Sequence, residues 1–395
     1  MKKRQFLSAT AAYSLLQIVS WGFFSVNLVF ASNVLYGFQF TDSQISIFLG
    51  LCTGLSFPLQ LGLAELSASG RKVTMWGLLT VLGFTMLLTN GLVLLPGIPG
   101  WAAIASYGMA CLILLMLPSF VNAIGMDAIR RGSPTNYAFA RGMGSLGYSV
   151  LAYLTGMLVR SRGTAMVPVL GSICAVLMVI SVLWYHGSGE KNLEILEKKQ
   201  QSNTEKTGFL GKYPRFTLFL GATVLIQYAH NLPSNFMYQI MLTKNGGAAQ
   251  QGVATAICAL VELPIMFFFP VLMRKLRCDK WVRFSAMFVI LKAAGILLAR
   301  TPGGVYLAQA TQSLGYGLFV ISSVNYAELV VDRGESVRAQ TYLGSTASVG
   351  CLLATATGGF LCQHLGVTAM VMTSLIASVA GGLLILLTAE KTDHL

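Results

Sequence analysis

The stretch GSGEKNLEILEKKQQSNTEKTGFLGKYPR (residues 187–215) is the longest polar segment of the chain, and it divides the apolar blocks into two groups. It is rich in Lys, Glu, Gln and Ser, a composition that suits a linker and cannot bury a core. Six long apolar blocks precede it and six follow it. This arrangement predicts an all-α membrane protein with two six-helix bundles, residues 1–186 and 213–395. A cytoplasmic linker, residues 187–212, joins them, with a short amphipathic helix near KNLEILEKK.

The composition indicates a chain that folds in a lipid bilayer. Hydrophobic residues make up 55% of it and charged residues only 10%, with a mean hydropathy of +0.68. A β-barrel would show alternating segments of about ten residues, and the blocks here are longer and continuously apolar. Each is long enough to cross about 30 Å of hydrocarbon as a helix. The twelve predicted membrane helices are 9–35, 43–66, 73–95, 100–127, 137–160, 164–186, 214–241, 248–275, 281–299, 303–330, 336–363 and 366–389.

The net charge of +13 is a signal of topology rather than of nucleic-acid binding. If both termini lie on one side, that side receives 21 of the 27 Lys and Arg residues, while the other receives four and two lie within helices. Cytoplasmic loops carry such an excess of basic residues. We therefore expect a multi-pass protein of the plasma (inner) membrane with both termini in the cytoplasm. The first helix follows MKKR without a cleavage signal, and we expect it to be retained.

The stretch ALVELPIMFFFP (residues 259–270) places the carboxylate of Glu262 deep within an apolar helix. A charge at the bilayer centre costs about 2.5–3.5 kcal/mol even on the lenient insertion scale, and such residues mark functional sites. Lys292 and Arg141 are the intramembrane cations available to it. Glu262 is therefore interpreted as a proton-exchanging and substrate-contacting group. The alternative is a structural salt bridge to Lys292.

Other polar residues in the apolar helices extend the candidate site. His230 can carry a proton, although next to Pro233 it can equally cap a broken helix. The amides Asn27, Asn122 and Gln312 either line a cavity or tie helices together. We found no phosphate-binding loop and no helical histidine pair for a metal. The sequence therefore predicts no enzyme, no metal and no cofactor beyond the coupling proton.

A basic loop follows the second helix of each half. At GLAELSASGRK (62–72) the chain resembles the signature loop of the major facilitator superfamily, with Glu65 where aspartate is usual and one extra residue before Arg71. The loop MRKLRCDKWVR (273–283) lies at the corresponding position of the second half, between its second and third helices. The resemblance implies alternating access around a midplane site between the halves. Cytoplasmic gating is assigned to Glu65, Arg71, Asp127 and Arg131.

Within this superfamily, NYAFARGMGSLGY (136–148) resembles the fifth helix of the lactose permease and oligosaccharide:proton symporter group. The resemblance implies that Arg141 hydrogen-bonds a sugar and that Tyr148 stacks on its ring. The structural alternatives are an arginine that reaches the interface and an aromatic residue that only packs.

The ninth helix, MFVILKAAGILLART (287–301), resembles that of the same group, with Lys292 where the group has an arginine tied to proton coupling. The tenth helix departs from the group, because Gln312 and Gly315 stand where lactose permease has a histidine and a glutamate. Lactose as substrate is therefore not implied, and the proton path cannot be carried over.

The sequence thus predicts a monomeric secondary transporter in the lipid bilayer that moves a small polar solute, a sugar or oligosaccharide, by proton-coupled symport. The alternatives are a nucleoside:proton symporter, a drug or metabolite efflux transporter, and a non-transporting membrane receptor. Substrate binding is assigned to Arg141, Tyr148, Asn122, Asn27, Glu262 and Gln312. Proton coupling is assigned to Glu262, Lys292 and His230.

Overall fold

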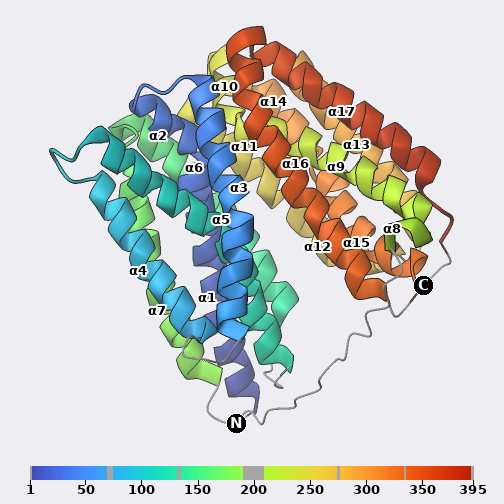
Figure 1. The fold of residues 1–395 in the computed structure, drawn as a ribbon, viewed down its shortest axis with the longest axis horizontal. Helices are drawn as coiled ribbons and strands as arrows, with labels where there is room; N and C mark the ends of the chain where they lie inside the picture. Colours follow the sequence, from blue (N-terminus) through green and yellow to red (C-terminus); the bar gives the residue numbers. More distant parts are fainter. Residues whose placement is uncertain are drawn as a thin grey trace. The chain divides into compact units, whose positions relative to one another are not determined.

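The computed structural model describes residues 2–68, 74–130, 135–189, 209–273, 276–332 and 335–392. These residues form helices joined by short connections, and no strand occurs among them. The all-α membrane fold expected from the apolar blocks is confirmed (Figure 1). The predicted amphipathic helix near residues 191–199 lies outside the described residues.

The chain divides into two compact units. Unit 1 comprises Met1–Phe40 and Leu51–Gln201, and unit 2 comprises Thr41–Gly50 and Ser202–Leu395. The helical elements of unit 1 are α1 (Lys2–Phe24), the π-helical segment η1 (Ser25–Val29), α2 (Ala31–Gly37), α3 (Asp42–Ala68), α4 (Met75–Val93), α5 (Gly100–Arg130), α6 (Tyr137–Arg162) and α7 (Met166–Gly189). The first nine residues of α3 cluster with unit 2.

Unit 2 has a corresponding series of elements. They are α8 (Phe209–Lys212), α9 (Pro214–Asn235), α10 (Met237–Thr243), α11 (Ala248–Leu260), α12 (Glu262–Met273), α13 (Cys278–Leu298), α14 (Pro302–Ala310), the π-helical segment η2 (Ser313–Gly317), α15 (Leu318–Val330), α16 (Ser336–Leu365) and α17 (Val367–Thr388). Within this unit, α9 packs along α16 and α17.

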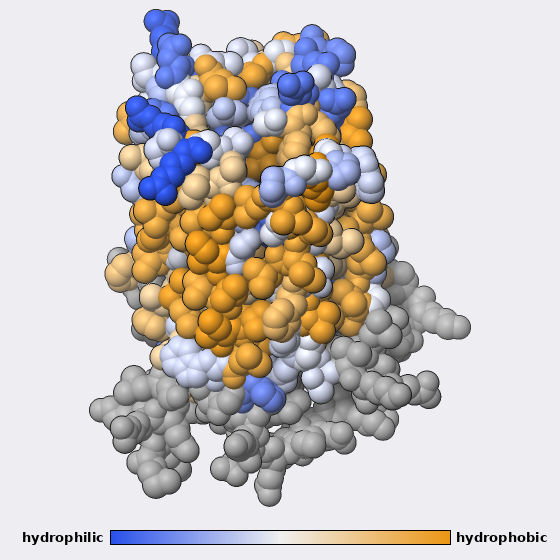
Figure 2. Space-filling model, turned by 90° about the vertical axis from the view of Figure 1, so that its left-hand side faces the viewer, coloured by the Kyte–Doolittle hydropathy of each residue, from blue (hydrophilic) through white to orange (hydrophobic). Residues whose placement is uncertain are grey.

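Ten of the segments in the described part of the chain are long and apolar enough to cross a membrane. The other two predicted spans, 214–241 and 303–330, are not among these ten, and each is divided into shorter elements. The first breaks at Phe236 between α9 and α10, and the second passes through η2. Large apolar side chains such as Leu88 on α4 and Leu183 on α7 are exposed, and Figure 2 shows a broad apolar surface on one face of the protein. Such a surface is suited to lipid.

The first membrane segment of each unit breaks in the same way. Phe30 and Phe236 leave the helical conformation with φ of −94° and −112°, and a seven-residue helix follows each. Gln39 and Asn245 then take left-handed φ values of 62° and 58°. The two members of each pair lie 206 residues apart, as do the starts of α3 and α11 at Asp42 and Ala248. The two halves are therefore repeats in backbone conformation as well as in hydropathy.

Closely packed glycines hold one helix pair together in each unit. A Cβ at Gly147 of α6 would lie 2.5 Å from the carbonyl oxygen of Ile18, which belongs to α1. A Cβ at Gly350 of α16 would lie 2.9 Å from the backbone nitrogen of Tyr228, which belongs to α9. These backbones approach too closely for any side chain, as in other tightly packed membrane helices.

The start of α3 is bound to α16 within unit 2. The Ser46 hydroxyl donates to the carbonyl of Thr355 and accepts from the Gly359 amide at 2.8 Å. The Gln239 side chain donates to the Asp42 carboxylate at 3.1 Å. These contacts explain why residues 41–50 belong to unit 2 although the helix continues into unit 1.

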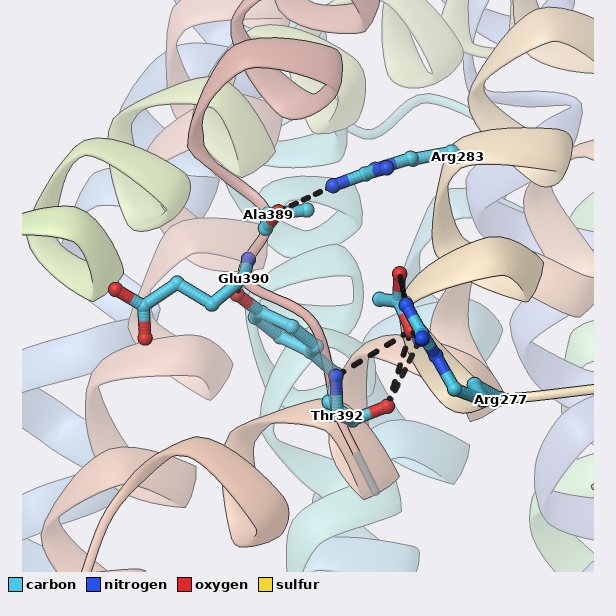
Figure 3. Close-up of polar contacts among 7 residues, drawn as sticks. Arg277, Arg283, Ala389, Glu390 and Thr392 are labelled. Carbon is cyan, nitrogen blue, oxygen red and sulfur yellow. Dashed lines mark hydrogen bonds and ion pairs between the residues drawn. The ribbon is translucent and has the colours of Figure 1, made fainter. Parts of the chain in front are cut away.

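Residues 389–392 are hydrogen-bonded to the start of α13. Arg277 forms two hydrogen bonds of 3.0 Å with the fully buried carboxylate of Asp279. The Thr392 hydroxyl donates to the same carboxylate at 3.2 Å, and Arg277 and Thr392 point toward one another in Figure 3. Arg283 donates to the carbonyl of Ala389. The basic loop of the second half is thereby tied to the C-terminal segment.

Candidate functional site

In unit 2 the candidate site begins at a helix break. Helix α11 ends at Leu260 and α12 begins at Glu262, so the predicted span 248–275 is two helices. Pro264 lacks a backbone N–H and its ring clashes with the carbonyl four residues earlier, which interrupts the helix at this point. The break places the Glu262 carboxylate in the first turn of α12, where the helix dipole favours an anion.

A second break, in the segment α14–η2–α15, brings Gln312 into the same cluster. Gln312 immediately precedes the π-helical residues 313–317, and Gly315 within them has non-helical angles (φ −85°, ψ −105°). A Cβ at Gly317 would lie 3.2 Å from Cγ of Glu262, and one at Gly315 would lie 3.2 Å from the backbone of Phe288. The glycines let η2 lie against both α12 and α13.

Gln312 links the two charged residues of unit 2. The Lys292 ammonium donates to Oε1 of Gln312 at 2.5 Å, and Nε2 of Gln312 donates to Oε1 of Glu262 at 2.6 Å. The orientation of the amide follows from chemistry, because an ammonium only donates and a carboxylate only accepts. Lys292 is 4% exposed and Gln312 is 1% exposed. The simple salt bridge considered from the sequence is therefore replaced by a charge pair with an amide between its members.

His230 lies in the same region of unit 2, against an aromatic ring. The rings of His230 and Tyr316 are stacked with centroids 3.5 Å apart and planes 8° apart. The Tyr316 hydroxyl donates to Oε1 of Gln227 at 2.9 Å, so α9 is joined to η2. Tyr316 was not predicted from the sequence. The spacing of Tyr316, four residues after Gln312, was the available signal, because it would place the two side chains on one face of a regular helix.

In unit 1 a second cluster forms around Arg141. Its guanidinium lies 4.1 Å from the ring centroid of Trp21, a cation–π contact. The Trp21 indole N–H donates to Oε1 of Gln17 at 3.0 Å. The Gln17 amide in turn donates to Asn122 Oδ1 at 3.1 Å and to the Tyr13 hydroxyl at 2.8 Å. Arg141 and Asn122, both predicted from the sequence, thus belong to one network, through Trp21 and Gln17, which were not predicted.

Tyr148 stands at the edge of this cluster. The Trp21 and Phe24 rings have centroids 5.7 Å apart, and the Phe24 and Tyr148 rings 6.4 Å. All three side chains are half-buried. They form an aromatic series next to Arg141, and the stacking of Tyr148 on a sugar ring stays a prediction.

Asn27 has a different environment from the other predicted binding residues. It is fully buried and donates to Oδ1 of Asn90 on α4 at 2.9 Å. Its backbone carbonyl, within the π-helical segment η1, accepts from the Tyr107 hydroxyl at 2.6 Å. These contacts favour the helix-tying alternative, and a role in substrate binding stays a prediction.

The predicted gating residues are mostly beyond what the structure describes. Arg71 and Arg131 lie outside the described residues. Glu65 and Asp127 fall on described helix backbone in α3 and α5, but their side chains are outside the described part. In the described part of the chain, no group of three or more His, Cys, Asp or Glu side chains suited to a metal ion occurs.

Two units of membrane helices with polar and charged side chains buried among them define a polytopic transporter of the major facilitator type. The chain belongs to the MFS_1 like family, whose family model matches residues 71–373. No curated protein sequence gives a match.

Solved structures support the same fold. The nucleoside transporter NupG superposes with a TM-score of 0.74 at 15% identity, covering 96% of this chain and 98% of NupG. A POT family transporter in complex with a thioalcohol-conjugated peptide gives a TM-score of 0.70 at 11% identity, covering 96% of this chain and 94% of the transporter. The identities are low, so these similarities establish the fold alone.

Proposed function

We propose that this transporter is a proton-coupled symporter that moves a small polar solute by alternating access. The observation that carries the proposal is the chain from Glu262 through Gln312 to Lys292. A carboxylate held between helices beside an amide and a cation is suited to gain and lose a proton during a transport cycle. No ATP-binding motif occurs in the sequence. A proton gradient is therefore the proposed energy source.

The change Glu262→Gln tests this role in liposomes. Glutamine keeps the size and the hydrogen bonding of a protonated glutamate, and it can never release a proton. The variant should exchange substrate across the membrane when substrate is present on both sides. It should lose accumulation driven by a pH gradient. Accumulation at the wild-type level by folded protein would remove Glu262 as the proton site.

A matched control is Glu328→Gln, the same change at an exposed position of α15 in the same unit. It should leave exchange and accumulation unchanged. A purely structural role of Glu262 predicts instead a loss of stability in Glu262→Gln that the double change with Lys292→Gln restores.

For the substrate we propose a nucleoside in preference to a sugar. Both carry ring hydroxyl groups, but only a nucleoside adds a planar base. The series Trp21, Phe24 and Tyr148 beside Arg141 brings three aromatic rings together, and a planar base can stack on such rings. The fold similarity to a nucleoside transporter agrees with this choice.

A thermal-shift screen of the purified protein separates the substrate classes. A specific ligand at 100 times its Kd stabilises the folded state by about 2.7 kcal/mol. Uridine or adenosine should raise the melting temperature, while glucose and lactose should not. A shift with the sugars alone would return the assignment to the sugar class predicted from the sequence. Vesicle uptake then distinguishes a symporter from an exporter, which moves solute outward, and from a receptor, which moves none.

We further propose that both termini lie in the cytoplasm and that the protein resides in the plasma (inner) membrane as a monomer. The basic residues carry this orientation. A membrane-impermeant thiol reagent added to intact cells should label Lys244→Cys and should not label Lys280→Cys. The reverse pattern would invert the orientation.

A further inference from the structure

We propose that Gln312 is a positioning residue that couples the protonation of Glu262 to the charge of Lys292. This inference rests on the proposed function, and it goes further by assigning the coupling to a neutral side chain. The two hydrogen bonds place one amide between a buried ammonium and a carboxylate, with each of its ends bonded to one charge.

An amide suits this position because its two ends differ. Oε1 only accepts and Nε2 only donates, so the bridge is fully satisfied when Lys292 carries a proton and Glu262 does not. Both hydrogen bonds then involve a charged partner, which makes them about twice as strong as neutral ones. The pair remains bonded through the amide, and neither charge is left without a partner in the low-dielectric interior.

Protonation of Glu262 changes this balance. A proton from the aqueous side binds to the carboxylate, the carboxyl group becomes neutral, and its hydrogen bond to Nε2 loses the assistance of charge. The hold of Gln312 on α12 weakens, while Lys292 on α13 keeps its positive charge without the nearby anion. Protonation therefore changes the contacts of three elements, α12, η2 and α13.

The local backbone supports a switching role. Gln312 stands at the entrance of the π-helical segment η2, and such segments are frequent at functional sites. Gly317 lets Glu262 approach η2, as described above, and Tyr316 of the same segment contacts both His230 and Gln227. A shift of Gln312 is therefore transmitted to α9 through residues of one short segment.

The test compares Gln312→Leu with Gln309→Leu in liposomes. Gln309 is a matched control, since it is a 2%-exposed amide on α14 whose Oε1 has no hydrogen-bond partner within the described structure. We expect Gln312→Leu to lose accumulation at least tenfold and to lose exchange by a much smaller factor. The dependence of its exchange rate on pH should shift relative to wild type. Gln309→Leu should resemble wild type in all three measurements.

The variant Gln312→His provides a rescue. A neutral imidazole has one donor and one acceptor, so it can bridge an ammonium and a carboxylate. We expect it to recover a substantial part of the accumulation that Gln312→Leu loses.

Other results would overturn the proposal in distinct ways. A drop of exchange, accumulation and melting temperature together in Gln312→Leu, with no change in pH dependence, would make Gln312 purely structural. A raised KM for exchange with accumulation intact would make it a substrate ligand. Failure of wild-type protein to accumulate any nucleoside or sugar under a pH gradient would instead reject the proposed function itself.

Discussion

In unit 1 the first membrane segment carries Trp21 and Phe24, and in unit 2 the positions 206 residues later are Gln227 and His230. The backbones correspond, since the breaks at Phe30 and Phe236 and the left-handed residues Gln39 and Asn245 have the same separation. The chemistry differs. Unit 1 presents aromatic rings and one cation, while unit 2 presents a carboxylate, an ammonium and an amide between them.

This comparison suggests a division of labour. Aromatic rings and a guanidinium recognise a solute without changing their charge. A carboxylate bridged to an ammonium can change its charge and thereby drive a cycle. The two units share a backbone conformation, but they carry different side chains at matched positions. The side chains of unit 1 are suited to recognise a solute, and those of unit 2 are suited to couple its movement to a proton.

The largest expected effect is the loss of the close helix contacts that both units have at a glycine. Gly147→Val and Gly350→Val each place a side chain against backbone atoms of the neighbouring helix. Overpacking costs about 1–3 kcal/mol and more where backbone must move. We expect both variants to lose most folded protein, to a similar degree in the two units. Thermal unfolding measures this.

The control for that pair is Gly344→Ala on α16, where a Cβ would meet nothing within 4 Å. It should be neutral or stabilising, because alanine favours a helix by about 1 kcal/mol over glycine. Strong destabilisation by Gly344→Ala, or a tolerated Gly350→Val, would contradict the close-packing account.

A smaller effect is expected at the fastening of the C-terminal segment. Asp279→Ala removes a buried carboxylate from Arg277 and Thr392, and we expect a loss of about 2 kcal/mol in unfolding free energy. Thr392→Val removes only the hydroxyl and should lose about 1 kcal/mol. The double variant should lose less than the sum of the two. Lys280→Ala, at the exposed neighbouring position, is the control. Equal stability of Asp279→Ala and wild type would show that this contact is not needed.

Recognition in unit 1 is tested by Arg141→Lys. A point charge cannot replace a planar guanidinium stacked on Trp21, so we expect substrate Kd to rise roughly tenfold, or about 1.4 kcal/mol. Proton coupling should remain, in contrast to Glu262→Gln. Arg160→Lys at the exposed end of α6 should bind as wild type does. Calorimetric titration of the identified ligand provides the measurement, and an unchanged Kd would remove Arg141 from the binding site.

The sequence predicts the helical membrane fold and the residues that carry charge within it, for physical reasons. Long apolar runs indicate that the helices lie in lipid, and a Glu, Lys or Arg within such a run has few possible roles. Trp21 and Tyr316 were missed because aromatic residues are common in apolar helices, and a spacing such as that of Tyr316, four residues after Gln312, occurs in packed cores as well as in sites. The π-helical segments were missed for another reason. They alter helix phase without altering hydropathy, and the position of Gln312 between Lys292 and Glu262 depends on one of them.

The smallest expected effect concerns an exposed ion pair in unit 2, which contrasts with the hydrogen bonds of Gln312 to Lys292 and Glu262. The Lys212 ammonium and the Tyr213 hydroxyl both donate to Asp332 Oδ2, at 2.9 Å and 2.7 Å. The hydrogen bond from Lys212, followed by that from Tyr213, lowers the pKa of the Asp332 carboxyl below its usual value. A carboxyl whose pKa is lowered on folding stabilises the protein above its unfolded pKa, near pH 4, and this contribution disappears as pH falls through the folded pKa.

Both side chains of that pair are exposed, Lys212 to 45% and Asp332 to 71%, so solvent screens the attraction. We therefore expect Asp332→Asn to unfold at the wild-type temperature at pH 7 and to differ from wild type only in a slightly flatter decline of stability below pH 4. Thermal unfolding across pH 3–7 provides the measurement. A clear loss of stability at pH 7 would show that the exposed Lys212–Asp332 pair stabilises unit 2. Burial would then not explain a difference in importance between this pair and the hydrogen bonds of Gln312.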